Sequence, residues 1–415
     1  EVQELTDTPE YLRRSLEAVV REVTRQYPVV LLTGPRQVGK TTMLKHLSEG
    51  TGRDYVSLDD LETRQSARTN PRLFLETHPP PLLIDEIQYA PELFTYLKIN
   101  VDQRQQPGDY WLTGSQLFKL MRGVQESLAG RIAHIRMSTL TRSEICGLPE
   151  VPFCVEEGFL LERHESRPVL SDRELFESIL RGAMPRLVAN SEMRPSVFYS
   201  SYLSSYLQRD IRNLAPATDE FKFLDFMRSA AIRCGQTVNY AAIARDAGVS
   251  EKTIKAWLTL LETLGIIFYL HPYSNNMLTR AIKAPKLYFF DTGLVAHLAR
   301  ISDAHELQDG VFGGPLLENY VVNEIWKSYL NYGQEPDIYY YRDVQQREID
   351  ILLRGAESLT PIEVKRSSNP GLKAISAFSA LDAVAGLRAP GAVVCLSQKL
   401  GSLTDKDYIV PVSLI

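Results

Sequence analysis

One octapeptide, residues 34–41, restricts the fold of this chain more than any other feature. It reads Gly-Pro-Arg-Gln-Val-Gly-Lys-Thr and fits the pattern G-x-x-x-x-G-K-[ST]. It follows the apolar run 29–32 and precedes a helical pattern, so it lies between an expected strand and an expected helix. We therefore expect a phosphate-binding loop at the end of a buried strand.

The residue types of this loop suit a nucleotide polyphosphate. Its glycines let backbone N–H groups turn inward around the phosphates, Lys40 bridges phosphate oxygens, and the Thr41 hydroxyl ligates Mg²⁺. The expected cofactors are therefore ATP and Mg²⁺, with a chance match to the pattern as the alternative. The residues expected to bind the nucleotide are Gly34, Pro35, Arg36, Gln37, Val38, Gly39, Lys40, Thr41 and Thr42.

Residues 82–86, Leu-Leu-Ile-Asp-Glu, form an apolar strand with an acidic end. We expect Asp85 to hold Mg²⁺ and Glu86 to polarise the attacking water. A third strand ends in small hydroxyl residues, of which Ser115, with Thr113 in reserve, is expected to sense the γ-phosphate. An acidic turn and a simple turn are the structural alternatives for these two segments. Together with the loop they predict an ATP-hydrolysing enzyme, with Lys40 among its catalytic residues.

Composition and charge bound the class of protein. A chain of 415 residues holds about two to four domains, and 44% hydrophobic with 23% charged residues is typical of a soluble globular protein. Apolar runs fall short of the roughly 18 residues that span a bilayer, so we expect no membrane partner and a cytoplasmic location. The four cysteines lack the spacing of a zinc site. The net charge of -5 means that any DNA contact must come from a local basic surface.

The order of patterns along the chain predicts an α/β protein. Strand-like runs alternate with helical stretches in the first third, which favours a mostly parallel sheet with both faces covered. A wholly helical pattern over 171–214 ends at a break around 215–218, and the remainder is mixed. The expected domains are a P-loop core at 1–150, a helical lid at 151–216, a winged helix at 217–300 and a C-terminal α/β domain at 301–415.

Over nearly its whole length the chain resembles the AAA+ superfamily, in particular bacterial and archaeal ATPases whose core is followed by a DUF4143 region. Four segments carry the resemblance in order: the loop just described, Ile-Asp-Glu-Ile-Gln at 84–88, Thr-Gly-Ser at 113–115 and Ser-Leu-Ala-Gly-Arg-Ile at 127–132. The resemblance implies a homo-oligomer formed through AAA+ cores, with Arg131 as an arginine finger that reaches a neighbouring subunit's γ-phosphate. It also implies that Arg186 acts as a nucleotide sensor in the lid. An exposed structural arginine is the alternative for Arg131.

Residues 240–258 predict a helix-turn-helix. A first helix ends at Gly248, Ser250 caps a second helix, and two apolar runs at 266–270 and 286–290 suggest a wing. A winged helix of this kind contacts DNA phosphates through exposed cations, although such modules also pack or dock proteins. The expected DNA-binding residues are Lys252, Thr253, Lys255, Arg280 and Lys283, with Lys286 beside them.

The C-terminal region reads as a helix, three strands, a helix and a strand. With Asp350, Glu363 and Lys365, this order resembles the PD-(D/E)XK nuclease fold. Residues 363 and 365 point to one face of a strand, where Asp350 can join them. Two carboxylates can bind Mg²⁺, Lys365 can orient water for attack on a phosphodiester, and Glu318 would add a further carboxylate. Because a Gln-Gln-Arg-Glu run at 345–348 replaces the usual proline-aspartate text, a structural Glu-x-Lys and a domain that only binds DNA or supports assembly remain alternatives.

The sequence thus predicts a Mg²⁺-dependent ATP-hydrolysing AAA+ protein that acts on duplex or branched DNA, including Holliday junctions. Its expected architecture is a P-loop AAA+ core with a helical lid, a winged helix and a C-terminal PD-(D/E)XK nuclease-like α/β domain. Two alternatives stay open: an ATP-dependent regulatory switch that docks proteins without nucleic-acid activity, and an ATP-coupled, Mg²⁺-dependent nuclease.

Overall fold

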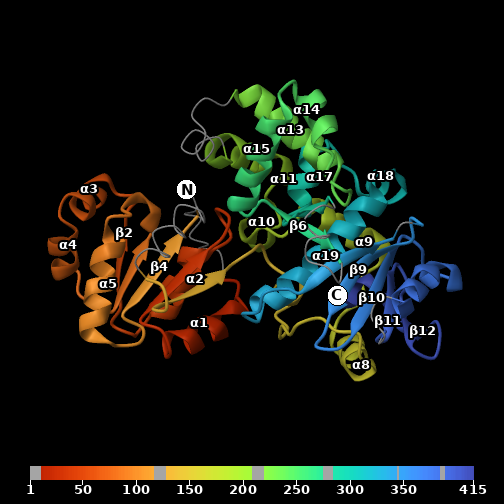
Figure 1. Ribbon diagram of the computed structural model, residues 1–415, viewed down its shortest axis with the longest axis horizontal. Coiled ribbons are helices and arrows are strands. Elements are labelled where there is room, and N and C mark those ends of the chain that lie inside the picture. Colours follow the sequence, from red (N-terminus) through yellow and green to blue (C-terminus); the bar gives the residue numbers. More distant parts are fainter. Residues whose placement is uncertain (1–10, 116–127, 208–218, 274–283, 344, 384–387) are drawn as a thin grey trace, which may run out of the picture.

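The structure of the protein is a computed structural model, which describes residues 11–115, 128–207, 219–273, 284–343, 345–383 and 388–415 (Figure 1). Two of the expected DNA-binding residues, Arg280 and Lys283, lie outside these ranges.

The first part of the chain forms a five-stranded parallel sheet of order β2-β3-β4-β1-β5. Its strands lie close to the runs expected from the sequence: β1 (Val29–Thr33), β2 (Asp54–Ser57), β3 (Leu82–Asp85), β4 (Tyr110–Gly114) and β5 (Ile132–Arg136). Because all five run in the same direction, their carboxyl ends share one edge of the sheet. The expected nucleotide-binding segments follow β1, β3 and β4 at that edge.

Helices cover both faces of this sheet, as a parallel sheet requires (Figure 1). They are α1 (Leu16–Thr24), α2 (Lys40–Ser48), α3 (Leu61–Thr69), α4 (Pro71–Thr77), the short 3₁₀ helix η1 (Ile87–Tyr89) and α5 (Leu93–Arg104). Side chains alternate along β1, so Val29 and Leu31 join one apolar cluster while Val30 and Leu32 join another. The second cluster continues into the middle and C-terminal parts of the chain.

A largely helical region follows the sheet. Its helices are α7 (Arg142–Ile145), α8 (Glu157–Ser166), α9 (Asp172–Arg181), α10 (Pro185–Ala189), α11 (Pro195–Tyr202), the π-helical turn η2 (Leu203–Leu207), α13 (Glu220–Ile232), α14 (Tyr240–Ala247), α15 (Glu251–Thr263), α17 (Thr292–Leu298) and α18 (Ala304–Asp309). Two arginines attach this region to the end of the chain, because Arg163 donates to the Leu414 carbonyl at 2.8 Å and Arg167 to the Ile415 carbonyl at 2.9 Å. Helix α9 packs against α17, α18 and α19 (Gly313–Asn331). The lid role expected for 151–216 stays a prediction.

The second sheet has eight strands in the order β12-β13-β11-β10-β9-β8-β6-β7. These strands are β6 (Ile267–Pro272), β7 (Lys286–Phe289), β8 (Ile338–Arg342), β9 (Glu348–Arg354), β10 (Leu359–Lys365), β11 (Gly391–Cys395), β12 (Gly401–Ser402) and β13 (Asp407–Pro411). Two 3₁₀ segments, η3 (Leu372–Ala383) and η4 (Val412–Leu414), complete the region. The order α19, three strands, η3 and β11 is the order expected from the sequence.

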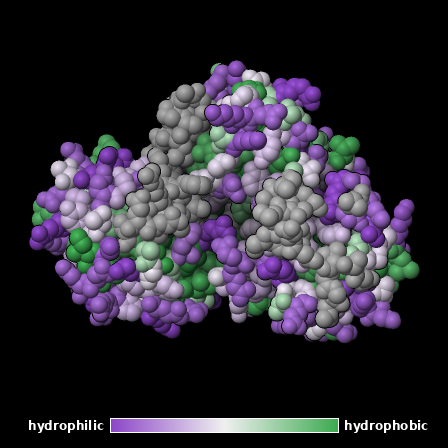
Figure 2. Space-filling model, in the orientation of Figure 1, coloured by the Kyte–Doolittle hydropathy of each residue, from purple (hydrophilic) through white to green (hydrophobic). Residues whose placement is uncertain are grey.

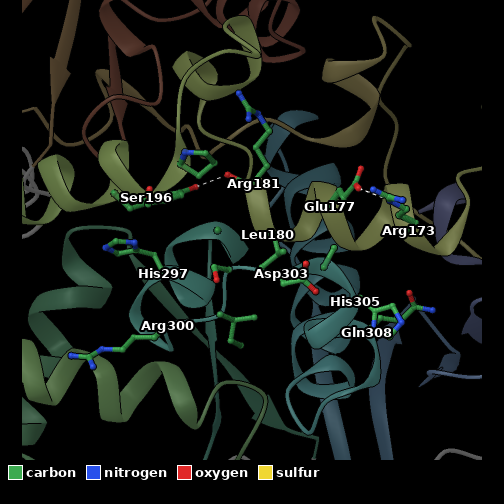
Figure 3. Close-up of a pocket in the computed structure, with 16 residues that line it drawn as sticks. Arg173, Glu177, Leu180, Arg181, Ser196, His297, Arg300, Asp303, His305 and Gln308 are labelled. Carbon is green, nitrogen blue, oxygen red and sulfur yellow. Dashed lines mark hydrogen bonds and ion pairs between the residues drawn. The ribbon is translucent and has the colours of Figure 1, made fainter.

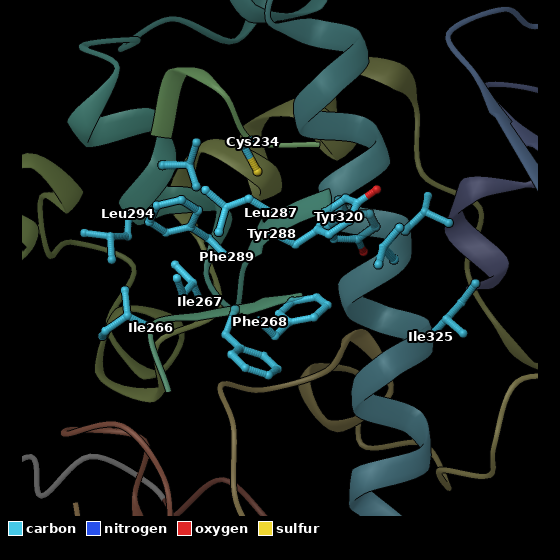
Figure 4. Close-up of a cluster of buried hydrophobic side chains, with 14 of the residues drawn as sticks. Cys234, Ile266, Ile267, Phe268, Leu287, Tyr288, Phe289, Leu294, Tyr320 and Ile325 are labelled. Atoms are coloured by element: carbon cyan, nitrogen blue, oxygen red, sulfur yellow. The ribbon is translucent and has the colours of Figure 1, made fainter. Parts of the chain in front are cut away.

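Strands β6 and β7 differ from the wing that the sequence suggested. They form an antiparallel pair, but β6 also pairs in parallel with β8, where His271 is aligned with Tyr339 and Pro272 with Tyr340. One sheet therefore crosses the expected boundary at residue 300. The physical reason is burial: Phe268 packs on Trp326 of α19, and Tyr288 lies beside the same helix, as Figure 4 shows, so this pair belongs to a shared core.

The face shown in Figure 2 is mostly hydrophilic, with hydrophobic residues scattered among polar ones. None of the helices in the described ranges is both long enough and apolar enough to cross a membrane.

Candidate nucleotide site and acidic cluster

The loop 34–41 turns sharply between β1 and α2. Gly34 has a φ of 150° and Gly39 a φ of 92°, which L side chains rarely adopt. A Cβ atom at Gly34 would also lie 2.0 Å from the carbonyl oxygen of Met137. Glycine is therefore required at Gly34 by space and at both positions by conformation, which explains two of the three fixed letters of the pattern.

Lys40, Thr41 and Asp85 meet at the carboxyl edge of the sheet. Lys40 is buried and its Nζ donates to the carbonyls of Gly34 at 2.9 Å and Pro35 at 2.7 Å. The Thr41 hydroxyl donates to Asp85 Oδ1 at 2.8 Å, and the Tyr55 hydroxyl donates to Asp85 Oδ2 at 3.1 Å. The two expected magnesium ligands, Thr41 and Asp85, are thus side by side, and neutral hydroxyls donate to the carboxylate.

Thr113 links Asp85 to Glu86. Its buried hydroxyl donates to Asp85 Oδ1 and accepts the Glu86 N–H at 3.1 Å. Glu86 has a φ of 57°, a left-handed conformation that is uncommon for this residue type. Thr113 therefore fixes the turn that aims Glu86, while Ser115 lies near enough to take part in the same network.

Gln88 is a residue whose role the sequence reasoning missed. Its Nε2 donates to Glu86 Oε2 and to the Ser115 hydroxyl at 3.3 Å. The signal was present, because Gln88 is the last letter of the quoted segment 84–88, but nothing in the pattern assigned it a partner. Gln88 joins the expected general base to the expected γ-phosphate sensor.

The remaining loop residues have distinct surroundings. Arg36 lies 4.0 Å from Glu86 Oε1 and donates to the Tyr89 hydroxyl at 3.2 Å. Gln37 has a φ of 64°, and Thr42 is exposed on the first turn of α2. Pro35 is buried against the turn after α15, where a Cβ atom at Gly265 would lie 3.0 Å from the proline ring.

Arg14 connects the back of the loop to the segment after β5. This buried side chain donates to the Val38 carbonyl at 2.7 Å and to the Ser138 carbonyl at 2.9 Å, and its Nε donates to Glu144 at 3.0 Å. No local sequence signal could have found it, because its carboxylate partner is 130 residues away.

The segment 138–144 continues from Arg14 to helix α19. Lys327 donates to the Leu140 carbonyl at 2.6 Å, and the Arg142 N–H donates to Glu324 at 2.8 Å. Lys327 and Glu324 also pair with each other at 2.6 Å. A chain of buried polar contacts therefore runs from the phosphate-binding loop to the long C-terminal helix.

His134 lies behind the loop, on β5. Its Nε2 is 2.8 Å from the Thr33 hydroxyl on β1. Burial, with a smaller contribution from the charge of Arg136, lowers the pKa of His134 to about 4. The imidazole is therefore neutral at physiological pH.

Arg131 precedes β5 and lies at the opposite, amino edge of the sheet from the loop of its own chain, because β5 runs parallel to β1. It pairs with Asp102 through two contacts, of 2.5 and 3.2 Å. Its action on a neighbouring subunit stays a prediction.

The helix-turn-helix forms as expected. Helix α14 ends at Gly248, which has a φ of 63°, and the Ser250 hydroxyl accepts the Thr253 N–H at the start of α15. Lys252 and Lys255 are exposed and Thr253 is half-buried. Their role in DNA binding stays a prediction.

The four C-terminal residues singled out in the sequence lie in one cluster. Asp350 Oδ2 accepts the Val364 N–H at 2.9 Å, which places it beside β10, and Lys365 pairs with Glu363. The charge of Asp350 acts on both Glu318 and Glu363. Among the residues that the structure describes, however, no set of three or more His, Cys, Asp or Glu side chains is arranged to hold a metal ion.

Lys286 also lies in this cluster, and for this residue the sequence interpretation was wrong. We expected it to contact phosphate at the surface, but it is 3% exposed and its Nζ lies 2.7 Å from Glu348, 3.0 Å from Glu318 and 3.8 Å from Asp350. The strand β7 turns its side chain inward because β7 is part of the eight-stranded sheet rather than of a wing.

The electrostatics of this cluster follow from burial and mutual repulsion. Burial first, and the charge of Asp350 second, raise the pKa of Glu318 to about 7 and that of Glu363 to about 8. Burial alone would lower the pKa of Lys286, but Glu318, Asp350 and Glu348 more than offset it, so the pKa lies above its ordinary value. Lys286 is therefore a charged ammonium.

A separate cavity of about 1050 Å³ opens where α9 faces α17 and α18 (Figure 3). Arg173 and Glu177 pair on one side at 2.8 Å, while His297 and Arg300 lie on the other. Its lining includes no residue of the nucleotide site or of the acidic cluster, so it contributes to neither.

Comparisons with known proteins divide the chain into three matched regions. Residues 26–146 match a family described as an AAA domain, residues 172–305 match a domain of unknown function, DUF8612, and residues 313–415 match a domain of unknown function, DUF4143. Two uncharacterized proteins, from Mycobacterium bovis and Mycobacterium tuberculosis, are each 28% identical over 87% of this chain and 75% of their own length.

Among solved structures, the Walker-type ATPase PABY2304 of Pyrococcus abyssi is 16% identical, covers 72% of this chain and 99% of its own, and has a TM-score of 0.43. The Thermotoga maritima Holliday junction branch migration motor RuvB is 17% identical, covers 61% of this chain and 86% of its own, and has a TM-score of 0.30.

The loop geometry, the acidic strand end and the AAA match define the class of this protein as a P-loop ATPase of the AAA type. More specifically, its AAA-matched region at 26–146 is followed by a region at 313–415 that matches DUF4143, as the sequence indicated.

Proposed function

We propose that this chain is a Mg²⁺-dependent ATPase whose nucleotide state controls contact of helix α15 with duplex or branched DNA. The observation that carries the proposal is the meeting of Lys40, Thr41, Asp85 and Glu86 at one edge of the sheet. Thr41 and Asp85 fit a magnesium ion, because an incoming cation would replace only neutral hydroxyl donors on the carboxylate. When bound, the ion neutralises charge on the β- and γ-phosphates.

The residues of the chain then have separate tasks. Lys40 and the loop amides position the phosphates, Glu86 accepts a proton from the attacking water, and Gln88 holds Glu86 in the direction of Ser115. Arg131 of a neighbouring subunit would add positive charge at the γ-phosphate, which makes a homo-oligomer part of the proposal.

Changes at the loop have a direct route to the rest of the molecule. Arg14 contacts both Val38 in the loop and Ser138 beyond β5, and Lys327 of α19 contacts the same segment at Leu140. The loop residue Pro35 also touches the turn that ends α15. A shift of the loop would therefore move α15 and α19, since close-packed and hydrogen-bonded contacts transmit displacement.

DNA is the proposed partner because of the exposed face of α15. Lys252 and Lys255 lie one turn apart on this face, with Ala256 and Thr259 exposed beside them. Two cations and small neighbours suit a helix that approaches a phosphate backbone. The alternative is a switch that docks a protein through the same face.

The test is nucleotide-dependent DNA binding by the full chain. We expect binding to branched or duplex DNA that weakens as the salt concentration rises. In Lys252→Ala/Lys255→Ala, the slope of log affinity against log salt concentration is expected to fall by about two in magnitude. Lys399→Ala, which removes an exposed lysine elsewhere, serves as the control. Arg14→Met is expected to keep DNA binding and lose its response to ATP.

Two outcomes would count against this proposal. Absence of DNA binding at low salt, with nucleotide-dependent assembly intact, would favour the protein-docking alternative. Equal salt dependence in the double variant and the wild type would remove α15 from the DNA contact.

A further inference from the structure

Lys286 occupies the centre of the C-terminal acidic cluster. It comes from β7, within the DUF8612 match, whereas Glu318, Glu348 and Asp350 come from α19 and β9, within the DUF4143 match. The contacts of the ammonium therefore join two separately matched regions of the chain.

The ammonium is compensated by these carboxylates. Its Nζ lies at hydrogen-bond distance from Glu348 and Glu318, at 2.7 and 3.0 Å, and 3.8 Å from the charge of Asp350. Tyr288, two residues further along β7, donates from its hydroxyl to the same Glu318 oxygen at 2.6 Å. Buried charges persist only with such compensation, so this cation is built into the fold.

Three of the four carboxylate oxygens of Asp350 and Glu363 already face a donor or a cation. Asp350 uses one oxygen for the Val364 N–H at 2.9 Å and turns the other toward Lys286. Glu363 uses one oxygen for Lys365, which leaves its second oxygen without a hydrogen-bond partner. A divalent ion coordinates oxygen at about 2.0–2.6 Å. It would therefore have to enter beside the ammonium of Lys286 and displace that of Lys365.

We infer that Lys286 is the resident cation of this cluster, that it excludes a divalent ion, and that it ties β7 to α19 and β9. The residues therefore do not fit the metal that a nuclease-like fold implies. The DUF4143 domain of this chain is accordingly not a metal-dependent nuclease while Lys286 is in place. This inference does not depend on the proposed DNA binding.

Manganese binding by the full chain tests the inference. All proteins carry Asp85→Asn, so that the ATP site contributes no ion, and Mn²⁺ binding is followed by electron paramagnetic resonance. In the protein that keeps Lys286, we expect no Mn²⁺ site that disappears when Asp350→Asn is added. Lys286→Met is expected to gain one such site, with an affinity for Mn²⁺ at least tenfold higher than that of the protein that keeps Lys286. Lys286→Met/Asp350→Asn is expected to lose this site.

Thermal unfolding gives a second readout. Lys286→Met removes the cation beside Glu318 and Asp350, whereas Glu348 keeps Arg342 at 3.6 Å. The Tm of the variant is therefore expected to fall, and Mn²⁺ is expected to restore part of that loss only in this variant. Lys399→Met is the surface control and is expected to match the wild type.

Three results would overturn the inference. The first is a Mn²⁺ site in the Lys286 protein that Asp350→Asn removes, and the second is metal-dependent cleavage of branched DNA that Asp350→Asn abolishes. The third is a folded Lys286→Met protein with no gain of Mn²⁺. If Lys286→Met does not fold, comparison of the Lys286 protein with and without Asp350→Asn still decides the matter.

Discussion

Two acidic sites of this protein use similar residues and differ in what surrounds them. At the P-loop, Asp85 accepts hydrogen bonds from the hydroxyls of Thr41, Tyr55 and Thr113. In the C-terminal cluster, Asp350 faces the ammonium of Lys286. The first carboxylate has neutral partners and the second already has a cation nearby.

The difference teaches that carboxylate placement alone does not define a metal site. Hydroxyl donors orient a carboxylate without neutralising it, so its charge remains available to a divalent ion. A buried ammonium supplies the compensating charge itself, and a metal must then overcome repulsion as well as displacement. We therefore propose that the same residue types serve ATP hydrolysis in one domain and domain cohesion in the other.

The largest expected effect separates the two sites by activity. Glu86→Gln should lower the ATP turnover rate about a hundredfold or more, because it removes the base that accepts the water proton. Glu363→Gln makes the same chemical change in the C-terminal cluster and should leave turnover within about twofold. Steady-state ATPase assays at saturating Mg²⁺ and ATP measure both, and similar losses in the two variants would break the comparison.

A smaller effect is expected at Gln88, the neutral partner of Glu86. Gln88→Ala should lower kcat about tenfold with little change in KM, because a hydrogen bond to a charged group contributes about 1.5–3 kcal/mol. Gln88→Glu provides the sharper contrast, since it places a second carboxylate beside Glu86 and should be the slower of the two variants. An unchanged kcat in Gln88→Ala would show that Glu86 is oriented by its backbone alone.

The smallest effect concerns stability and His134, the neutral imidazole that pairs with Thr33 behind the loop. The folded-state pKa of His134, about 4, lies below its ordinary value of 6.5, so the unfolded chain binds more protons between these values. Stability from this group is thus complete above pH 6.5 and is lost as pH falls toward 4. We expect it to contribute about 2 kcal/mol less to the free energy of unfolding at pH 5 than at pH 7.5.

Denaturant unfolding of His134→Gln across this pH range measures that contribution. In this variant the free energy of unfolding should fall less between pH 7.5 and pH 5 than in the wild type. In His305→Gln, which changes an exposed histidine, it should fall as much as in the wild type. Identical pH profiles for His134→Gln and the wild type would contradict the assignment of a buried neutral imidazole.

Much of the ATP site was accessible from the sequence because its parts are local. The loop, the acidic end of β3 and the hydroxyl end of β4 each follow a strand, and parallel strands bring their ends to one edge. Gln88 was within the quoted motif but had no assigned partner, since the turn at Glu86 decides which side chain it meets.

The sequence by itself determined the nucleotide chemistry of this protein, because spacing along the chain sets which groups a strand-loop-helix unit presents to phosphate. Only the tertiary structure decided the roles of Arg14 and Lys286. Arg14 meets a carboxylate 130 residues away, and Lys286 meets one 32 residues away after β7 joins a sheet that the sequence had divided. A buried charge is defined by the groups that surround it, and those groups come together only when distant segments pack.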